Sequence, residues 1–206
     1  MKDLKSPELG GRILGGNCGC NTTQLEGVGC CSPSKQSKGE TDTRKILNVD
    51  LLVIDLSTCK RCVPTGDQLR EAIKLLSPVA ESLGIELRHQ EIVVQTPEEA
   101  KEKALISSPT IRINGRDIDQ DIRESECESC GDLTNHNISV DCREWHYRGK
   151  VYSAAPVPLL LEAIMGAMLN IDGMPPVVPA PLEELSENLQ RYFDNKKQNR
   201  IISCCS

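Results

Sequence analysis

Two cysteines separated by two residues, Cys59 and Cys62, offer the clearest chemistry in the sequence. This spacing lets two sulfurs close a small disulfide loop, and the thiolate is the nucleophile in thiol–disulfide exchange. Lys60 and Arg61 lie between them, and their positive charges would lower the pKa of a neighbouring thiol. We therefore expect a catalytic dithiol in which Cys59 is the more exposed, attacking thiolate and Cys62 resolves the mixed disulfide.

The same Cys-x-x-Cys pair could instead supply two of the four tetrahedral ligands of a zinc ion. The predicted elements around the pair favour redox chemistry. The apolar run Val49–Leu56 predicts a buried strand that ends just before the cysteines. A helical pattern follows, with one apolar face made of Leu69, Ala72, Ile73, Leu76, Ala80 and Leu83. Residues 65–68 form a capping-box sequence, which predicts that the helix begins at Thr65, and Pro78 predicts a kink.

A second group of possible ligands lies in or just after a polar segment, residues 116–142. Cys127, Cys130, Cys142 and His146 follow the pattern Cys-x-x-Cys…Cys-x-x-x-His, which is typical of a small zinc site. A structural zinc ion would hold a segment that has too little apolar content to fold alone. These four residues are therefore the predicted metal ligands.

Three alternatives remain for this second group. His136 could replace His146 as the fourth zinc ligand. The cysteines of the segment could also form a redox pair or a metalloid site that exchanges electrons or ions with the first dithiol, or they could be incidental thiols. His89 falls on a predicted strand and is interpreted as a partly buried structural histidine.

The remaining cysteines lie near the two ends of the chain, at Cys18, Cys20, Cys30, Cys31, Cys204 and Cys205. Closely spaced cysteines among glycines can wrap a soft ion, because glycine lets the backbone fold around it. We interpret these six as accessory thiols, the alternative being tails with incidental thiols. The Cys204–Cys205 pair resembles the C-terminal dithiols of mercuric reductase and of some thioredoxin reductases. That resemblance implies a mobile tail that visits the Cys59 site.

Composition and charge narrow the class of protein. The net charge of −6 gives no reason to expect nucleic acid or an anionic membrane as a partner. No apolar segment resembles a signal peptide or reaches transmembrane length, so we expect a cytoplasmic location. Eleven cysteines in that compartment are expected to serve redox exchange or metal binding rather than a static disulfide scaffold.

The pattern predicts three regions: a flexible cysteine-rich arm at 1–45, an α/β domain at 46–172 with its insertion at 116–142, and 173–206. The last region comprises a proline-rich extended linker, an amphipathic helix and the vicinal-cysteine tail. The helix has an apolar stripe of Leu182, Leu185, Leu189, Tyr192 and Phe193. Within the domain, further strands are predicted at 85–94 and 111–113, a helix at 97–105, a turn at 114–115, a hairpin at 145–153 and a helix at 156–169.

The order of strand, Cys59-x-x-Cys62, kinked helix, strand, short helix and Ser108-Pro109-Thr110 resembles the thioredoxin superfamily. This resemblance implies a thioredoxin-like fold, a central mixed sheet flanked by helices. It also implies a cis-proline at Pro109 that shapes the substrate groove beside the dithiol. The chain is more narrowly similar to a bacterial and archaeal thioredoxin-like family of unknown function with a cysteine-containing insertion, matched here by Cys127–Gly131 and Cys142–Trp145. The Trp-Cys-Gly-Pro-Cys sequence of ordinary thioredoxin is absent.

Three functions follow as hypotheses. The first is a thiol–disulfide oxidoreductase that works with a protein thiol or reductase, or on thiol-bound metal or metalloid. The second is a thiol-rich protein that binds or transfers a soft ion such as arsenite or mercuric ion. The third is a redox-inactive, zinc-binding interaction module. The cofactor expected, if there is one, is zinc or a soft metal or metalloid ion.

Overall fold

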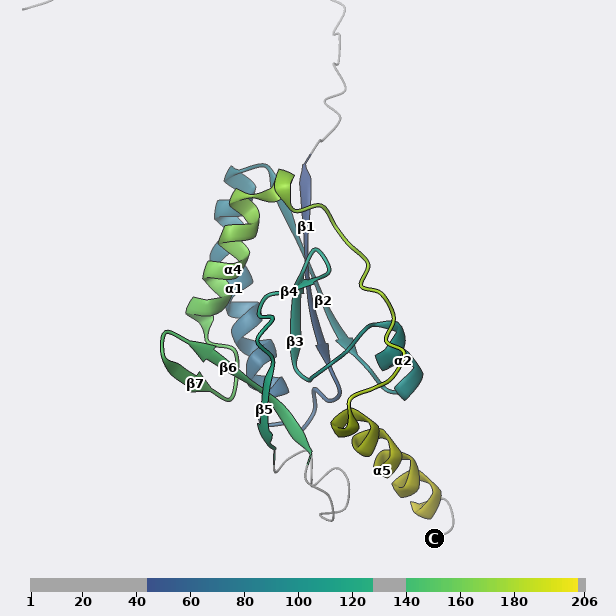
Figure 1. Cartoon of the computed structure of the whole chain (residues 1–206). Helices are drawn as coiled ribbons and strands as arrows, with labels where there is room; N and C mark the ends of the chain where they lie inside the picture. Colours follow the sequence, from purple (N-terminus) through teal and green to yellow (C-terminus); the bar gives the residue numbers. More distant parts are fainter. Residues whose placement is uncertain (1–43, 128–139, 204–206) are drawn as a thin grey trace, which may run out of the picture. The chain divides into compact units, whose positions relative to one another are not determined.

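The computed structural model describes residues 44–127 and 140–203 of the chain, with side chains up to residue 197. Its main sheet is mixed and has the strand order β2-β1-β3-β4, with β1 parallel to β2 and antiparallel to β3 (Figure 1). The strands are β1 (Lys45–Val53), β2 (Ile85–Val93), β3 (Thr110–Ile113) and β4 (Arg116–Asp117). Because β1 and β2 are parallel, a helix has to connect them.

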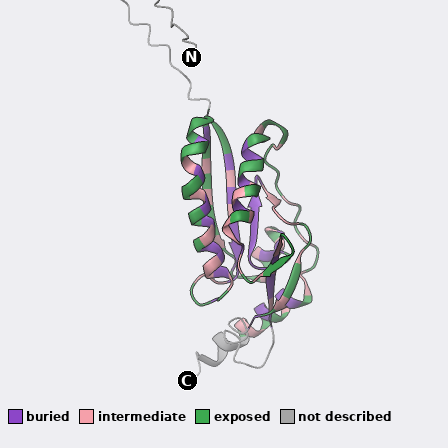
Figure 2. Cartoon of the chain, turned by 90° about the vertical axis from the view of Figure 1, so that its left-hand side faces the viewer, coloured by how far each residue is buried: buried purple, intermediate pink, exposed green. Residues whose placement is uncertain are grey.

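Two helices, α1 (Cys62–Ser82) and α4 (Val157–Leu169), pack beside each other on one face of this sheet (Figure 1). The sides of the helices that face the sheet are buried, as are most residues of the central strands (Figure 2). On β1, Leu47, Val49 and Leu51 are fully buried, whereas Asn48 and Asp50, which alternate with them, are only partly buried. This period of two is what the pleat of a strand imposes.

The predicted start of α1 at Thr65 is wrong, because the helix begins at Cys62. Thr65 is buried, and its hydroxyl donates to the Arg61 carbonyl at 2.7 Å and accepts the Ala155 N–H at 3.3 Å. The Thr65 hydroxyl, which the capping-box sequence assigns to a helix start, therefore makes one local hydrogen bond and one tertiary hydrogen bond to Ala155. As a result, Cys62 occupies the first position of the helix, where unpaired backbone N–H groups favour negative charge.

Of three other predicted elements, a helix start and a turn lie where the sequence predicts them, and a strand is displaced. The helix α2 (Pro97–Glu102) begins as predicted, with the Thr96 hydroxyl accepting the Glu99 N–H at 3.1 Å and the Glu99 carboxylate accepting the Gln95 N–H at 2.7 Å. The Asn114–Gly115 turn joins β3 to β4 with positive φ at both residues. The predicted strand Val49–Leu56 is displaced toward the N-terminus, since β1 ends at Val53.

The predicted coreless insertion contributes strands. β5 (Arg123–Glu126), β6 (Asp141–Tyr147) and β7 (Lys150–Tyr152) form a small antiparallel sheet in the order β5-β6-β7. β6 and β7 make the predicted hairpin, which turns at Arg148–Gly149 with positive φ. One cysteine discussed below, Cys142, lies on β6 of this second sheet, and another, Cys127, directly follows β5.

The C-terminal segment is held on the domain. After a short helix η1 (Ile171–Gly173), the chain is extended as predicted, but it is not a free linker. Val177 N–H donates to the Asn114 carbonyl at 3.0 Å, and Leu182 N–H donates to the Lys101 carbonyl at 2.9 Å. The helix α5 (Glu187–Ser203) buries Leu189, Tyr192 and Phe193, whereas Leu182 and Leu185 of the predicted stripe precede it. The segment that leads to the predicted mobile tail is therefore anchored to the domain at least as far as α5.

Gly115 should be essential for this anchoring. A methyl group there would overlap the Val177 carbonyl oxygen, in addition to the strain of φ +81°. Gly149 is a matched control, with φ +75° and no atom within 4 Å of an added methyl. We expect Gly149→Ala to lower the free energy of unfolding by about 1 kcal/mol. Gly115→Ala should cost about 1–2 kcal/mol more and expose residues 174–182 to protease, because displacement breaks the Val177 hydrogen bond. Urea unfolding and mapped proteolysis measure both effects, and equal losses for the two variants would contradict this account.

The mixed sheet with flanking helices is compatible with a thioredoxin-like fold. The Ser108–Pro109 peptide bond is cis, as that resemblance implies. Among the residues that the structure describes, no helix has the length and apolar character needed to cross a membrane.

Candidate metal centre

Three buried sulfurs converge in the described part of the chain. The Sγ atoms of Cys59, Cys127 and Cys142 all lie within 4.8 Å of one another. Cys59 and Cys142 are 0% exposed and Cys127 is 4% exposed. Cys59 lies in the loop after β1, Cys127 directly after β5 and Cys142 on β6, so the group forms only when the second sheet packs on the first. None of these three residues, nor Cys62, is in a disulfide.

The loop that carries Cys59 is built around the Asp55 carboxylate. One of its oxygens accepts the backbone N–H groups of Thr58 and Cys59, both at 2.8 Å, and the other accepts the Ser57 hydroxyl at 2.6 Å. Partial burial opposes ionisation of Asp55, but these hydrogen bonds outweigh it and hold the pKa of the carboxyl below its ordinary value. Asp55 therefore fixes the backbone of the loop after β1 as far as Cys59.

Cys62, the second cysteine of the Cys-x-x-Cys pair, contacts Cys59. Its backbone N–H donates to the Cys59 sulfur at 3.3 Å, and its own sulfur lies 3.5 Å from the Ser108 hydroxyl oxygen. That hydroxyl oxygen also accepts the Ile54 N–H at 3.1 Å. The side-chain hydrogen bond with Cys59, together with burial, raises the pKa of the Cys62 thiol.

Arg61 joins the Cys59 loop to the second sheet. Its guanidinium donates to the Cys142 carbonyl at 2.9 Å, to the Ser125 hydroxyl at 2.9 Å and to the Glu126 carbonyl at 2.6 Å. It therefore contacts both β5 and β6, beside the cysteine that each strand presents. The sequence pattern treated Arg61 only as a positive charge near a thiol, whereas its planar fork holds two strands in place.

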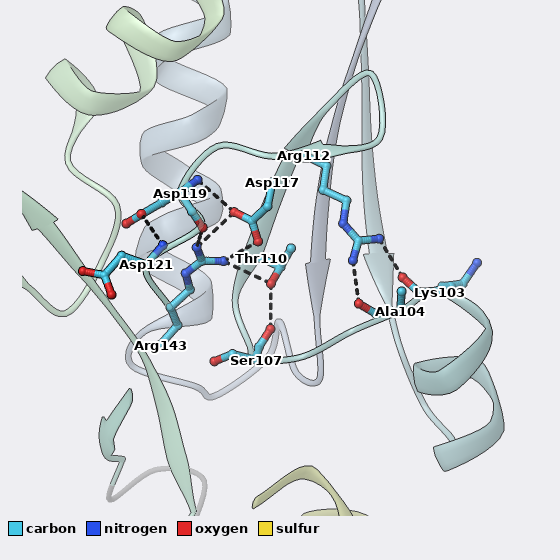
Figure 3. Close-up of polar contacts among 9 residues, drawn as sticks. All are labelled: Lys103, Ala104, Ser107, Thr110, Arg112, Asp117, Asp119, Asp121 and Arg143. Carbon is cyan, nitrogen blue, oxygen red and sulfur yellow. Dashed lines mark hydrogen bonds and ion pairs between the residues drawn. The ribbon is translucent and has the colours of Figure 1, made fainter. Parts of the chain in front are cut away.

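Figure 3 shows the polar contacts of Arg143, the neighbour of Cys142 on β6. The Arg143 side chain is fully buried and makes a bidentate ion pair with Asp117, at 2.8 and 3.0 Å. It also donates to the Thr110 hydroxyl at 3.3 Å and to the Asp119 carbonyl, and it stacks over the Trp145 ring. Arg143 N–H donates to the Ser108 carbonyl at 2.9 Å. Because neighbouring residues on a strand point to opposite faces, fixing Arg143 directs Cys142 toward Cys59.

The structure rearranges the predicted site residues. The expectation that Cys59 is the more exposed thiol is wrong, since both Cys59 and Cys62 are 0% exposed. Ser108, which precedes Pro109, has its hydroxyl oxygen 3.5 Å from the Cys62 sulfur, and a role of Pro109 in shaping a substrate groove stays a prediction. Of the four predicted zinc ligands, Cys127 and Cys142 come together, with Cys59 as their third partner. Cys130, His136 and the six accessory thiols near the chain ends lie outside the described residues.

His146 lies apart from the three sulfurs. Its Nε2 is 2.9 Å from a Glu144 carboxylate oxygen. Four residues of extended strand separate His146 from Cys142 by about 13 Å, too far for one ion to bind both side chains. His89 is partly buried on β2, as interpreted, and burial lowers its pKa.

A family model described as a domain of unknown function, DUF2703, matches residues 47–164. The chain belongs to the DUF2703 family. The matched region contains Cys59, Cys62, Cys127 and Cys142, so the whole centre lies within the DUF2703 domain. A search of curated proteins and a search of solved structures found no match. In this DUF2703 protein the three clustered sulfurs could hold a metal ion, because thiolates from separate segments can ligate one soft ion.

Proposed function

We propose that this protein binds a soft metal or metalloid ion through the thiolates of Cys59, Cys127 and Cys142. The observation that carries this proposal is the approach of three buried sulfurs to within 4.8 Å of one another. Tetrahedral zinc sites have ligand sulfurs about 3.8 Å apart, as follows from Zn–S bonds of about 2.3 Å. The sulfurs therefore need only a small adjustment to share one ion.

The number of ligands favours an ion that three sulfurs satisfy. In the part of the chain that the structure describes, the group has three members, whereas structural zinc takes four protein ligands. Arsenite bonds three thiolates, and the resulting complex is neutral. Burial penalises a net charge, so a trivalent metalloid suits this enclosed site best, and mercuric ion is the next candidate.

Access to the site is expected through β5. Among the described strands β5 pairs only with β6, and three of its four residues are exposed. Cys127, which follows β5, is also the one cysteine of the three with measurable exposure. Local separation of β5 would open the centre without disturbing the main sheet.

A second candidate function is thiol–disulfide exchange by the Cys59–Cys62 pair of a thioredoxin-like fold, with a protein thiol or disulfide as partner. It is supported by the Cys62 N–H that donates to the Cys59 sulfur at the start of α1, an arrangement that stabilises a thiolate at Cys59. Cys62→Ser should abolish reduction of a model disulfide substrate under this hypothesis. Retained activity in that variant would contradict it.

The ion-binding proposal is tested in a tail-serine variant, the full chain with serine at positions 18, 20, 30, 31, 204 and 205. Anaerobically reduced protein is titrated with arsenite, and the thiols that remain reactive toward a chromogenic disulfide are counted. We expect one equivalent of arsenite to protect three thiols. Cys59→Ser, Cys127→Ser and Cys142→Ser should each weaken binding at least about 100-fold, since each removes a direct ligand.

Cys62→Ser is the matched control, because it removes a neighbouring buried thiol and leaves the three sulfurs intact. We expect it to bind arsenite as tightly as the parent. Binding that survives all three ligand substitutions would overturn the proposal. A different result would favour the ligand set predicted from spacing, which includes Cys130 and excludes Cys59. In that result the single variants Cys127→Ser, Cys130→Ser and Cys142→Ser each lose binding, and Cys59→Ser keeps it.

A further inference from the structure

The Cys59 sulfur belongs to two groups, the Cys-x-x-Cys pair and the cluster of three sulfurs. Toward α1, its sulfur accepts the Cys62 N–H at 3.3 Å, in the four-residue loop of a Cys-x-x-Cys pair. Toward the second sheet, the same sulfur lies within 4.8 Å of the sulfurs of Cys127 and Cys142. One sulfur cannot be a thiolate ligand and a disulfide partner at the same time. The two arrangements therefore compete for Cys59.

We infer that oxidation of Cys59 and Cys62 to a disulfide releases the ion held by Cys59, Cys127 and Cys142. This inference rests on the proposed ion-binding function and adds the regulation of that site. Cys62 is then a release residue: it takes no part in holding the ion and withdraws one of the three ligands when it is oxidised.

The oxidant is a low-molecular-weight disulfide such as glutathione disulfide. The Cys59 thiolate attacks one sulfur of this disulfide, forms a mixed disulfide and expels one thiolate. Cys62 then loses its proton and attacks the Cys59 sulfur, which forms the Cys59–Cys62 bond and expels a second thiolate. The proton from Cys62 remains with the departing thiol or the solvent. Two protein thiols are oxidised, one external disulfide is reduced to two thiols, and the ion passes to the released thiols or to water.

The contacts of β5 and β6 explain why release of the ion leaves Cys127 and Cys142 in place. Cys127 directly follows β5 and Cys142 lies on β6, and these strands are held by Arg61 and by the Arg143–Asp117 ion pair, neither of which involves a sulfur. Oxidation therefore reduces a three-sulfur site to a two-sulfur site within an unchanged frame. Two thiolates bind a three-coordinate ion far more weakly, and re-reduction of the disulfide restores the third ligand.

Thermodynamic linkage makes the effect reciprocal. If the disulfide lowers arsenite affinity by a given factor, bound arsenite makes the dithiol harder to oxidise by the same factor. We expect this factor to be at least about 100, the scale on which loss of even an outer contact weakens a metal site. A factor of 100 corresponds to a shift of about +59 mV in the reduction potential of the pair, at 29.6 mV per tenfold change for two electrons.

The test uses the tail-serine variant and two measurements. In the first, the protein is oxidised with glutathione disulfide, the small thiols are removed by gel filtration, and arsenite affinity is compared with that of reduced protein. We expect a loss of at least about 100-fold, with mass spectrometry locating the disulfide at Cys59 and Cys62. Cys62→Ser cannot form this bond, so its oxidation should stop at the Cys59–glutathione mixed disulfide, which mass spectrometry detects as one added glutathione.

In the second measurement, the reduction potential of the pair is determined with and without saturating arsenite. A positive shift of about 59 mV or more is expected, because bound arsenite stabilises the reduced pair. An unchanged potential, equal affinity in the oxidised and reduced proteins, or release from the parent without a Cys59–Cys62 disulfide would overturn the inference. A reduced protein that binds no arsenite would instead overturn the proposed function on which the inference rests, so the two failures are distinguishable.

Discussion

Arg61→Met is expected to weaken arsenite binding about 10- to 100-fold although Arg61 is not itself a ligand. Outer contacts that orient metal ligands have effects of this size. The Arg61 guanidinium bonds the Cys142 carbonyl and the Glu126 carbonyl, and thereby fixes the backbone beside Cys142 and Cys127. Without it, the two sulfurs stay on their strands but are no longer held at the distance from Cys59 that one ion requires. Affinity is measured with arsenite on the anaerobically reduced tail-serine variant.

Two further variants separate position from charge. Arg61→Lys keeps the positive charge but lacks the planar fork that reaches both strands, so it should bind nearly as weakly as Arg61→Met. Arg88→Met removes an exposed arginine that pairs with Glu86 on β2, away from the centre, and should bind like the parent. Arsenite affinity in Arg61→Lys equal to that of the parent would show that charge alone matters. An unchanged free energy of unfolding in Arg61→Met would show that the loss is local to the site.

The elements whose signals are local could be predicted from the sequence. The start of α2 depends on Thr96 and Glu99, which are neighbours along the chain, and the Asn114–Gly115 turn depends on the backbone preferences of its own residues. The start of α1 could not be predicted in this way. Thr65 has the right neighbours for a cap, but its buried hydroxyl bonds Ala155, a partner that only the tertiary fold brings near.

The candidate centre has the same limitation. Cys59 and Cys62 are close in sequence, and their proximity in the structure could be predicted from spacing, whereas a disulfide between them stays a prediction. Cys142 and His146 have a spacing that suits one ion on a helix, where residues four apart are neighbours. On the strand that actually forms, the same spacing separates them by about 13 Å. The spacing of Cys127 and Cys142 predicted that these two would share a site, but Cys59 joins them only through docking of the β5–β6 pair, which no local pattern indicates.

Asp117→Asn is expected to lower the free energy of unfolding by about 3 kcal/mol, because it leaves the Arg143 guanidinium buried without its ionic partner. Arg143 is fully buried, and the bidentate pair with Asp117 neutralises its charge (Figure 3). The pair also ties β6 to β4, so its loss should loosen Cys142 and weaken arsenite binding. Urea unfolding of the reduced protein, followed by Trp145 fluorescence and by circular dichroism, measures the change.

Asp121→Asn is the matched control, since it makes the same substitution in an ion pair at the surface. Asp121 pairs with Arg123, and their side chains are 68% and 53% exposed. Exposed pairs contribute about 0–1 kcal/mol, so Asp121→Asn should change the free energy of unfolding by less than about 1 kcal/mol. Similar small losses in both variants would mean that the Thr110 hydroxyl, the Asp119 carbonyl and the Trp145 ring suffice to stabilise Arg143. In that case Cys142 would be directed toward Cys59 by the Arg61 contacts and the Arg143–Ser108 backbone bond rather than by the buried ion pair.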